Sequence, residues 1–160
     1  MAPLGRLGPS YPAQVKQAYR ILYYVLSLEI LIQAAMIAWW GFGVSAYADD
    51  HGSISSNKLE DGGFGGSAGL TVHAVNGFMI IPVIALALLV VAFLAKVPGG
   101  LRLATITFVL VVVQAYVLPA LSEEAPAVGM LHGAVALAIL GLTIAAPRRA
   151  RDADVAPAAS

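Results

Sequence analysis

The sequence contains no cysteine, and this absence excludes several kinds of site. Disulfides, thiolate metal centres, cysteine-ligated iron–sulfur clusters and the covalent attachment of c-type haem all require cysteine, which none of the 160 residues supplies. Charge is also scarce, because only 11% of the residues are charged, against roughly 25% in soluble domains. Nine basic residues balance nine acidic ones, so we expect no basic surface and no nucleic acid partner.

Hydrophobic sequence is what the chain has in quantity. A hydrophobic content of 59% and a mean hydropathy of +0.83 are typical of integral membrane proteins. Four apolar stretches approach or exceed the ~20 residues that a membrane helix needs. They cover about residues 20–47, 69–95, 101–121 and 127–146. We therefore expect an all-α membrane protein whose four-helix bundle occupies residues 19–147.

The segments outside these four spans are predicted to lie outside the membrane. Residues 1–18 are rich in proline and glycine and indicate an exposed cytoplasmic leader, and residues 148–160 indicate a disordered cytoplasmic tail. Residues 49–69 are polar and glycine-rich without apolar periodicity, which predicts an external loop. Within the second span, Pro82 removes one backbone hydrogen bond and predicts a kink.

The distribution of basic residues predicts the orientation of the bundle. One side of the four-span topology carries eight of the nine basic residues. These are Arg6, Lys16, Arg20, Lys96, Arg102, Arg148, Arg149 and Arg151. The other side carries Lys58. The positive-inside rule therefore places both termini in the cytoplasm of a multi-pass cell-membrane protein. Tyr19, Tyr23 and Tyr24 are expected to anchor the cytoplasmic edge in the lipid bilayer.

Polar residues within the spans suggest an internal repeat. Gln33 lies in the first span, thirteen residues after Arg20, and Gln114 lies in the third span, twelve residues after Arg102. An alanine follows each glutamine. His73 and His132 lie near the outer ends of the second and fourth spans. A two-helix unit, glutamine helix then histidine helix, is thus used twice. We expect a tandem parallel repeat with a pseudo-twofold axis along the membrane normal.

The two histidines are the candidate ligands of a metal cofactor. Ionisable residues inside membrane spans usually face a bundle interior, and two imidazoles on separate helices suit the iron of one b-type haem. His73 and His132 are the predicted axial ligands. Such a haem would lie near the outer leaflet and relay single electrons to a quinone or to a partner subunit.

Residues around the histidines complete the predicted cofactor site. Gln33, Gln114 and Asn76 are expected to accept hydrogen bonds from the imidazole nitrogens that do not bind iron. Gly77, one turn after His73, and Gly133, next to His132, would leave room for a flat macrocycle.

Two features of the sequence oppose this interpretation. Counted from the nearest cytoplasmic cation, Arg148 or Lys96, His132 lies roughly 24 Å and His73 roughly 34 Å along its helix. A difference of about 10 Å would separate the rings. The haem propionates would also have only Lys58 as a basic partner on the outer side.

Other functions stay open at the level of sequence. The histidines could hydrogen-bond the glutamines in a non-catalytic structural or assembly subunit, with glycines allowing close helix packing. An ion or small-solute transporter would need a continuous polar path, which an oligomer could supply. Zinc or copper is a further possibility, but two histidines are fewer ligands than a zinc site usually has. Whether the chain is an enzyme is left open, since it has no phosphate-binding loop or nucleophile elbow.

Glu29 is the one acidic residue deep within a predicted span. It could relay protons or cations. A neutral carboxylic acid, hydrogen-bonded to Thr107 or Thr143, is the interpretation favoured here, because a single carboxyl group does not make a pathway.

The pattern resembles two groups of membrane proteins. Gln33, His73, Gln114 and His132 make residues 19–147 similar to small four-span bacterial membrane proteins of an uncharacterised actinobacterial type. The arrangement also resembles four-helix membrane b-type cytochromes, which hold haem between histidines on facing helices. The latter resemblance implies a single haem here, because the sequence has no histidine on the cytoplasmic side.

Overall fold

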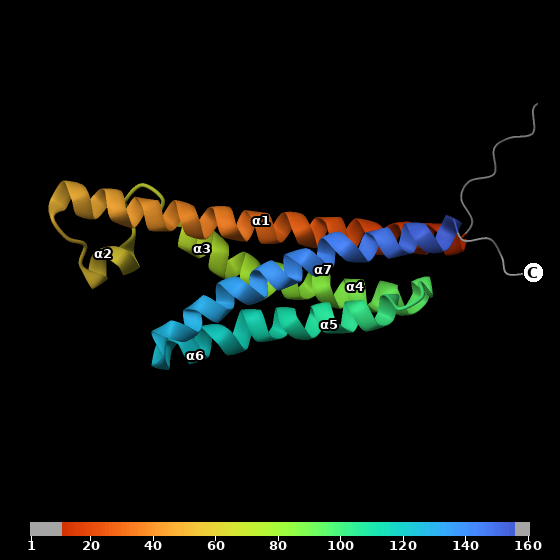
Figure 1. Cartoon of the computed structure of the whole chain (residues 1–160). Helices are drawn as coiled ribbons and strands as arrows, with labels where there is room; N and C mark the ends of the chain where they lie inside the picture. Colours follow the sequence, from red (N-terminus) through yellow and green to blue (C-terminus); the bar gives the residue numbers. More distant parts are fainter. Residues whose placement is uncertain (1–10, 156–160) are drawn as a thin grey trace, which may run out of the picture.

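The computed structural model describes residues 11–155, which form helices and the turns between them (Figure 1). The elements in chain order are α1 (Tyr11–His51), α2 (Ser56–Asp61), α3 (Ala68–Val75), the π-helical η1 (Asn76–Ile80), α4 (Ile81–Ala95), α5 (Gly100–Val112), the π-helical η2 (Val113–Val117), α6 (Leu118–Glu124), the 3₁₀-helical η3 (Pro126–Val128) and α7 (Gly129–Val155).

Successive helical segments join into four long rods. The first is α1, the second is α3–η1–α4, the third is α5–η2–α6, and the fourth is η3–α7. Each rod is long and apolar enough to cross a membrane, by length and composition. In the bundle, α1 packs against α4 and α7, and α5 packs against the same two helices. The prediction of an all-helical bundle with four long apolar helices is confirmed, and it is consistent with a multi-pass membrane protein.

The bundle has two distinct ends (Figure 1). The start of α1, the turn between α4 and α5 and the last part of α7 lie together at one end, named here the terminal end. The short helices α2 and α6 lie at the opposite end, named the loop end. Both ends of the described chain are therefore on the same side of the bundle.

The helices extend further than the sequence predicted at both ends of the chain. Helix α1 begins at Tyr11, so residues 11–18 are helical rather than part of a leader, while residues 1–10 lie outside the described residues. Helix α7 continues to Val155 through the start of the predicted tail, and residues 156–160 are not described. The Arg151 guanidinium donates a hydrogen bond to the Tyr24 hydroxyl, which fastens this extension to α1.

The predicted loop at residues 49–69 is partly helical. Helix α1 continues to His51, and α2 follows after Ser55, whose Oγ accepts a hydrogen bond from the Lys58 backbone N–H at 3.2 Å. A serine in this position satisfies a backbone donor that a helix start otherwise leaves free. Capping chemistry thus produces a short polar helix that carries no apolar periodicity.

Glycines let the chain after α2 return in direct contact with α1. A Cβ on Gly66 would lie 2.4 Å from the carbonyl oxygen of Trp39, and a Cβ on Gly69 would lie 2.4 Å from that of Met36. Contacts this close exclude any side chain. The start of the second rod is therefore held against the backbone of α1.

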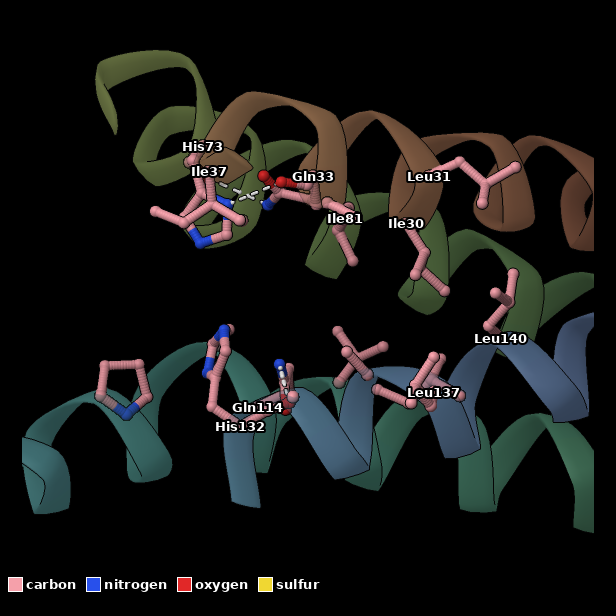
Figure 2. Close-up of a pocket in the computed structure, with 18 of the residues that line it drawn as sticks. Ile30, Leu31, Gln33, Ile37, His73, Ile81, Gln114, His132, Leu137 and Leu140 are labelled. Carbon is pink, nitrogen blue, oxygen red and sulfur yellow. Dashed lines mark hydrogen bonds between the residues drawn. The ribbon is translucent and has the colours of Figure 1, made fainter. Parts of the chain in front are cut away.

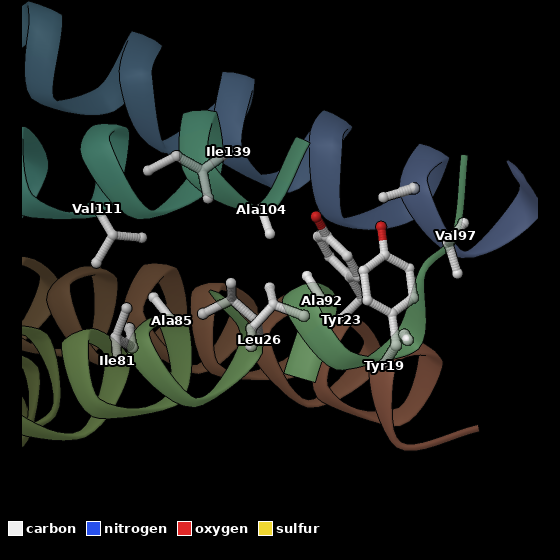
Figure 3. Close-up of a cluster of buried hydrophobic side chains, with 13 residues drawn as sticks. Tyr19, Tyr23, Leu26, Ile81, Ala85, Ala92, Val97, Ala104, Val111 and Ile139 are labelled. Atoms are coloured by element: carbon white, nitrogen blue, oxygen red, sulfur yellow. The ribbon is translucent and has the colours of Figure 1, made fainter. Parts of the chain in front are cut away.

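A cluster of buried hydrophobic side chains extends toward the terminal end of the bundle (Figure 3). Tyr19, Tyr23 and Leu26 are fully buried there, and the two tyrosine rings meet edge to face at 4.9 Å. The prediction that Tyr19 and Tyr23 anchor the chain at an interface is therefore wrong. Their spacing of four residues places both on the core face of α1, whereas Tyr24 is 45% exposed.

Two rods contain a π-helical segment directly before a proline. The segment η1 ends two residues before Pro82, and η2 ends two residues before Pro119. Proline has no N–H to donate to the preceding turn, and a π-turn inserts one extra residue into the helix. The second rod therefore accommodates Pro82 by widening its helix locally. Both π-helical segments also border the candidate site.

Candidate functional site

A cavity of about 460 Å³, named here the crevice, lies between two pairs of helices (Figure 2). One wall comes from α1, α3 and η1, and the facing wall comes from η2 and α7. Its lining is aliphatic except for Phe78 and four polar side chains. These four are Gln33, His73, Gln114 and His132. Among the residues that the structure describes, the crevice is lined by no Asp, Glu, Lys or Arg side chain. Its volume is within the range of small-molecule and cofactor sites.

The two histidine rings face each other across this crevice (Figure 2). Their centroids are 6.1 Å apart and their planes are inclined by 51°. The prediction that His73 and His132 meet is confirmed, and the height difference counted from the sequence is wrong. That count took Arg148 as the end of the fourth helix, whereas α7 continues to Val155.

Gln33 and His73 are joined by two reciprocal hydrogen bonds. The Gln33 side-chain Nε2 donates to the backbone carbonyl of His73 at 3.0 Å. In return, Nδ1 of the His73 ring lies 3.2 Å from the backbone carbonyl of Gln33. A carbonyl only accepts, so Nδ1 carries the proton, and the neutral ring keeps an unprotonated Nε2. The pair of bonds fixes both the tautomer and the orientation of the imidazole.

Gln114 and His132 make the corresponding contact on the facing wall. The Gln114 Nε2 donates to the backbone carbonyl of His132 at 2.8 Å. The side chains of both glutamines thus bind the backbone of the histidine, whereas the sequence predicted that they would bind its ring.

Asn76 and Glu29 lie outside the crevice and pair with each other. The Asn76 Nδ2 donates to Glu29 Oε2 at 2.8 Å. Asn76 therefore does not orient an imidazole, contrary to the prediction. The predicted threonine partners of Glu29 are wrong too: Thr143 accepts a hydrogen bond from Ser27 Oγ at 2.7 Å. An amide donor suits a carboxylate oxygen, so the pair satisfies Glu29 without a hydroxyl.

The two glycines predicted to make room for a ligand have different environments. A Cβ on Gly77 would lie 2.7 Å from Gln33 Nε2, so this glycine allows the amide to reach the His73 carbonyl. A Cβ on Gly133 would have nothing within 4 Å, and this residue borders open space in the crevice. Only Gly133 therefore has the environment that the sequence predicted for both.

The contact between Gly77 and Gln33 gives a substitution that can be compared with a matched control. We expect Gly77→Ala to displace the Gln33 amide and to weaken any metal cofactor held by His73 by about 10-fold, the lower end of the loss seen when outer-shell partners are removed. Gly141→Ala adds the same methyl group in α7, where a Cβ would have nothing within 4 Å and would lie outside the crevice, so it should leave cofactor affinity within about twofold of wild type. Titration of each purified variant with haem measures both. Equal losses in the two variants would contradict the role of the Gln33 contact.

The crevice offers ligands for a metal that brings its other donors with it. Among residues 11–155, no cluster of three or more His, Asp or Glu side chains is placed to hold a bare metal ion. Zinc sites usually draw three or four ligands from the protein. Two imidazoles instead match a metal already held in a macrocycle, which needs only axial ligands.

Lys58 does not line the crevice. Its Nζ donates to the Gly63 carbonyl at 3.3 Å and lies 5.5 Å from the centre of the Tyr47 ring. A ligand carboxylate within the crevice would therefore meet glutamine amides and imidazoles rather than the Lys58 ammonium group.

The π-helical segments and the hydrogen bond between Tyr116 and Phe78 were not predicted from the sequence. The Tyr116 hydroxyl donates to the backbone carbonyl of Phe78 at 2.7 Å and so links η2 to η1. Pro82, four residues after Phe78, was the available signal, because a helical proline leaves a carbonyl that needs another donor.

No known protein family, curated protein or solved structure matches this chain. The resemblance to four-span membrane proteins and b-type cytochromes therefore stays a prediction.

Proposed function

We propose that this chain is a membrane b-type haem protein in which His73 and His132 are the axial ligands of one haem. The observation that carries the proposal is the opposed pair of imidazoles, 6.1 Å apart between ring centroids. Imidazoles this close on facing helices would each offer one ring nitrogen to a metal held between them. The aliphatic walls of the crevice suit the faces of a macrocycle.

The hydrogen bond at Nδ1 of His73 supports the same proposal. A histidine that binds a metal almost always donates its other ring N–H to a carboxylate, a backbone carbonyl or water. The carbonyl of Gln33 is such a partner for His73. Gln33 and Gln114 would thus position the ligands through the histidine backbone, and Gln33 also through its own carbonyl, while Gly133 would border the macrocycle.

The four apolar rods support placement of this protein in a cell membrane. By the positive-inside rule the terminal end faces the cytoplasm, and the loop end, with the histidines nearer to it, faces outward. The haem would lie toward the outer leaflet. The same contact between glutamine and histidine occurs in both halves of the chain, which supports the proposed tandem repeat of two-helix units.

A haem with two axial histidines supplies reversible single-electron transfer, and oxygen chemistry would first require one histidine to dissociate. The protein would hold the ring nitrogens at a fixed separation and keep water from the macrocycle faces. The electron partner would be a quinone in the bilayer or another subunit.

A structural role is the second candidate, because the glutamine contacts also join neighbouring helices. Hydrogen bonds between membrane helices contribute about 0.6 kcal/mol each on average. In that case the crevice would be a packing defect or a lipid site, and no pigment would accompany the protein.

Purification from haem-replete cells separates the two candidates. We expect one haem per chain and a reduced-minus-oxidised difference spectrum of the low-spin b type. A colourless preparation that also fails to take up added haem would refute the haem proposal and leave the structural role.

A further inference from the structure

We infer that Tyr116 is a positioning residue for the histidine pair, acting through the backbone carbonyl of Phe78, to which Pro82 cannot donate the N–H of an α-helical turn. In an α-helix the carbonyl of Phe78 would accept the N–H of residue 82. That residue is proline and has no N–H. The Tyr116 hydroxyl, 2.7 Å away, takes its place.

This hydrogen bond joins the two π-helical segments. Phe78 belongs to η1 and Tyr116 to η2, and their rings lie 5.9 Å apart at 37°. Gly77 in η1 and Gln114 in η2 both border the crevice. π-Helical insertions inside α-helices often occur at functional sites, because one extra residue re-aims the side chains around it. The hydrogen bond from Tyr116 to Phe78 therefore fixes the position of η1 relative to η2.

The positions of both histidines follow from that register. His73 lies one turn before η1 in the same rod. On the other side, Gln114, two residues before Tyr116, donates to the backbone of His132. A chain of covalent and hydrogen-bonded links thus runs from His73 through Phe78 and Tyr116 to His132. Loss of the Tyr116 hydroxyl should let the two walls of the crevice move apart.

A double-substitution cycle tests the carbonyl link. Tyr116→Phe removes the hydroxyl and keeps the ring, so it should shift the unfolding equilibrium in detergent by roughly threefold, the average for one hydrogen bond between membrane helices. Pro82→Ala supplies the missing N–H to Phe78. In the Pro82→Ala background, Tyr116→Phe should therefore shift the equilibrium by much less. An equal shift in both backgrounds would overturn the link.

The positions of the two imidazole rings can be followed by nuclear magnetic resonance of their nitrogen atoms. In protein labelled with ¹⁵N-histidine, we expect Tyr116→Phe to move the ring ¹⁵N resonances of both His73 and His132 but not those of His51, and Pro82→Ala to reduce this change. Tyr24→Phe, which removes a hydroxyl that accepts from Arg151 away from the crevice, is the control and should leave the two histidines near their wild-type shifts. Unchanged His73 and His132 resonances in Tyr116→Phe would overturn the positioning role.

The functional meaning of this positioning rests on the proposed haem site, but neither measurement needs haem. A protein without haem would refute the proposed function while the stability cycle and the ¹⁵N spectra still decide the role of Tyr116. A haem-binding protein with no response in either measurement would refute the role of Tyr116 alone.

Discussion

Replacing either His73 or His132 with alanine is expected to abolish stable haem binding. Each variant would leave the iron with one protein ligand in an aliphatic crevice that has no other side chain of suitable chemistry near the rings. The loss should exceed the 10- to 100-fold typical of outer-shell substitutions. Haem content per chain after purification, with the absorption spectrum of what remains, measures the effect.

His51→Ala is the matched control for both variants. His51 is exposed at the end of α1, where its ring stacks on Tyr47 at 4.1 Å between centroids. It should keep wild-type haem content and spectrum. If the His73 and His132 variants also kept their haem, the iron ligands would have to be other groups.

The second large effect is expected from Gly43→Ala at the loop end. A Cβ on Gly43 would lie 1.8 Å from the backbone carbonyl oxygen of Gly65, a distance that no rotamer change can relieve. The return of the chain against α1 would have to open. We expect a loss of about 3 kcal/mol in the free energy of unfolding, the upper part of the range for overpacking, measured by denaturation in detergent.

Gly41→Ala isolates the clash from the general effect of replacing glycine in a helix. Gly41 lies two residues earlier in α1, and a Cβ there would have nothing within 4 Å. Alanine favours a helix by up to about 1 kcal/mol over glycine, so this variant should be neutral or slightly more stable. A Gly43→Ala protein as stable as Gly41→Ala would show that α1 and residues 65–69 are not packed as described.

The four rods were predictable because long apolar stretches are a strong signal that depends on composition alone. Their ends were not. Helix α7 passes Arg148 because Ala146 and Pro147 are buried and Arg151 reaches Tyr24 of α1. Such contacts join parts of the chain that are distant in sequence, so the end of the helix cannot be predicted from the residues around it alone. The polar helix α2 was missed for the opposite reason, since its signal is a single serine cap rather than a pattern.

The candidate site was predictable in identity but not in detail. Two histidines and two glutamines at corresponding places in an apolar sequence pointed to one site, and the structure brings the four together. Which atoms bond could not be read from sequence. The Gln33 amide donates to the backbone carbonyl of His73 because Gly77 has no side chain in its way. This contact joins two helices and cannot be predicted from either segment alone. Likewise, Asn76 binds Glu29 instead of an imidazole because η1 packs against α1.

The geometry of the two imidazoles can be measured most directly by electron paramagnetic resonance of the oxidised, haem-containing protein at low temperature. Two axial histidines predict a low-spin ferric signal that accounts for nearly all of the iron and that is lost in His73→Ala and in His132→Ala. A purely high-spin signal, or a low-spin signal that survives either substitution, would contradict the claim that these two rings share one iron.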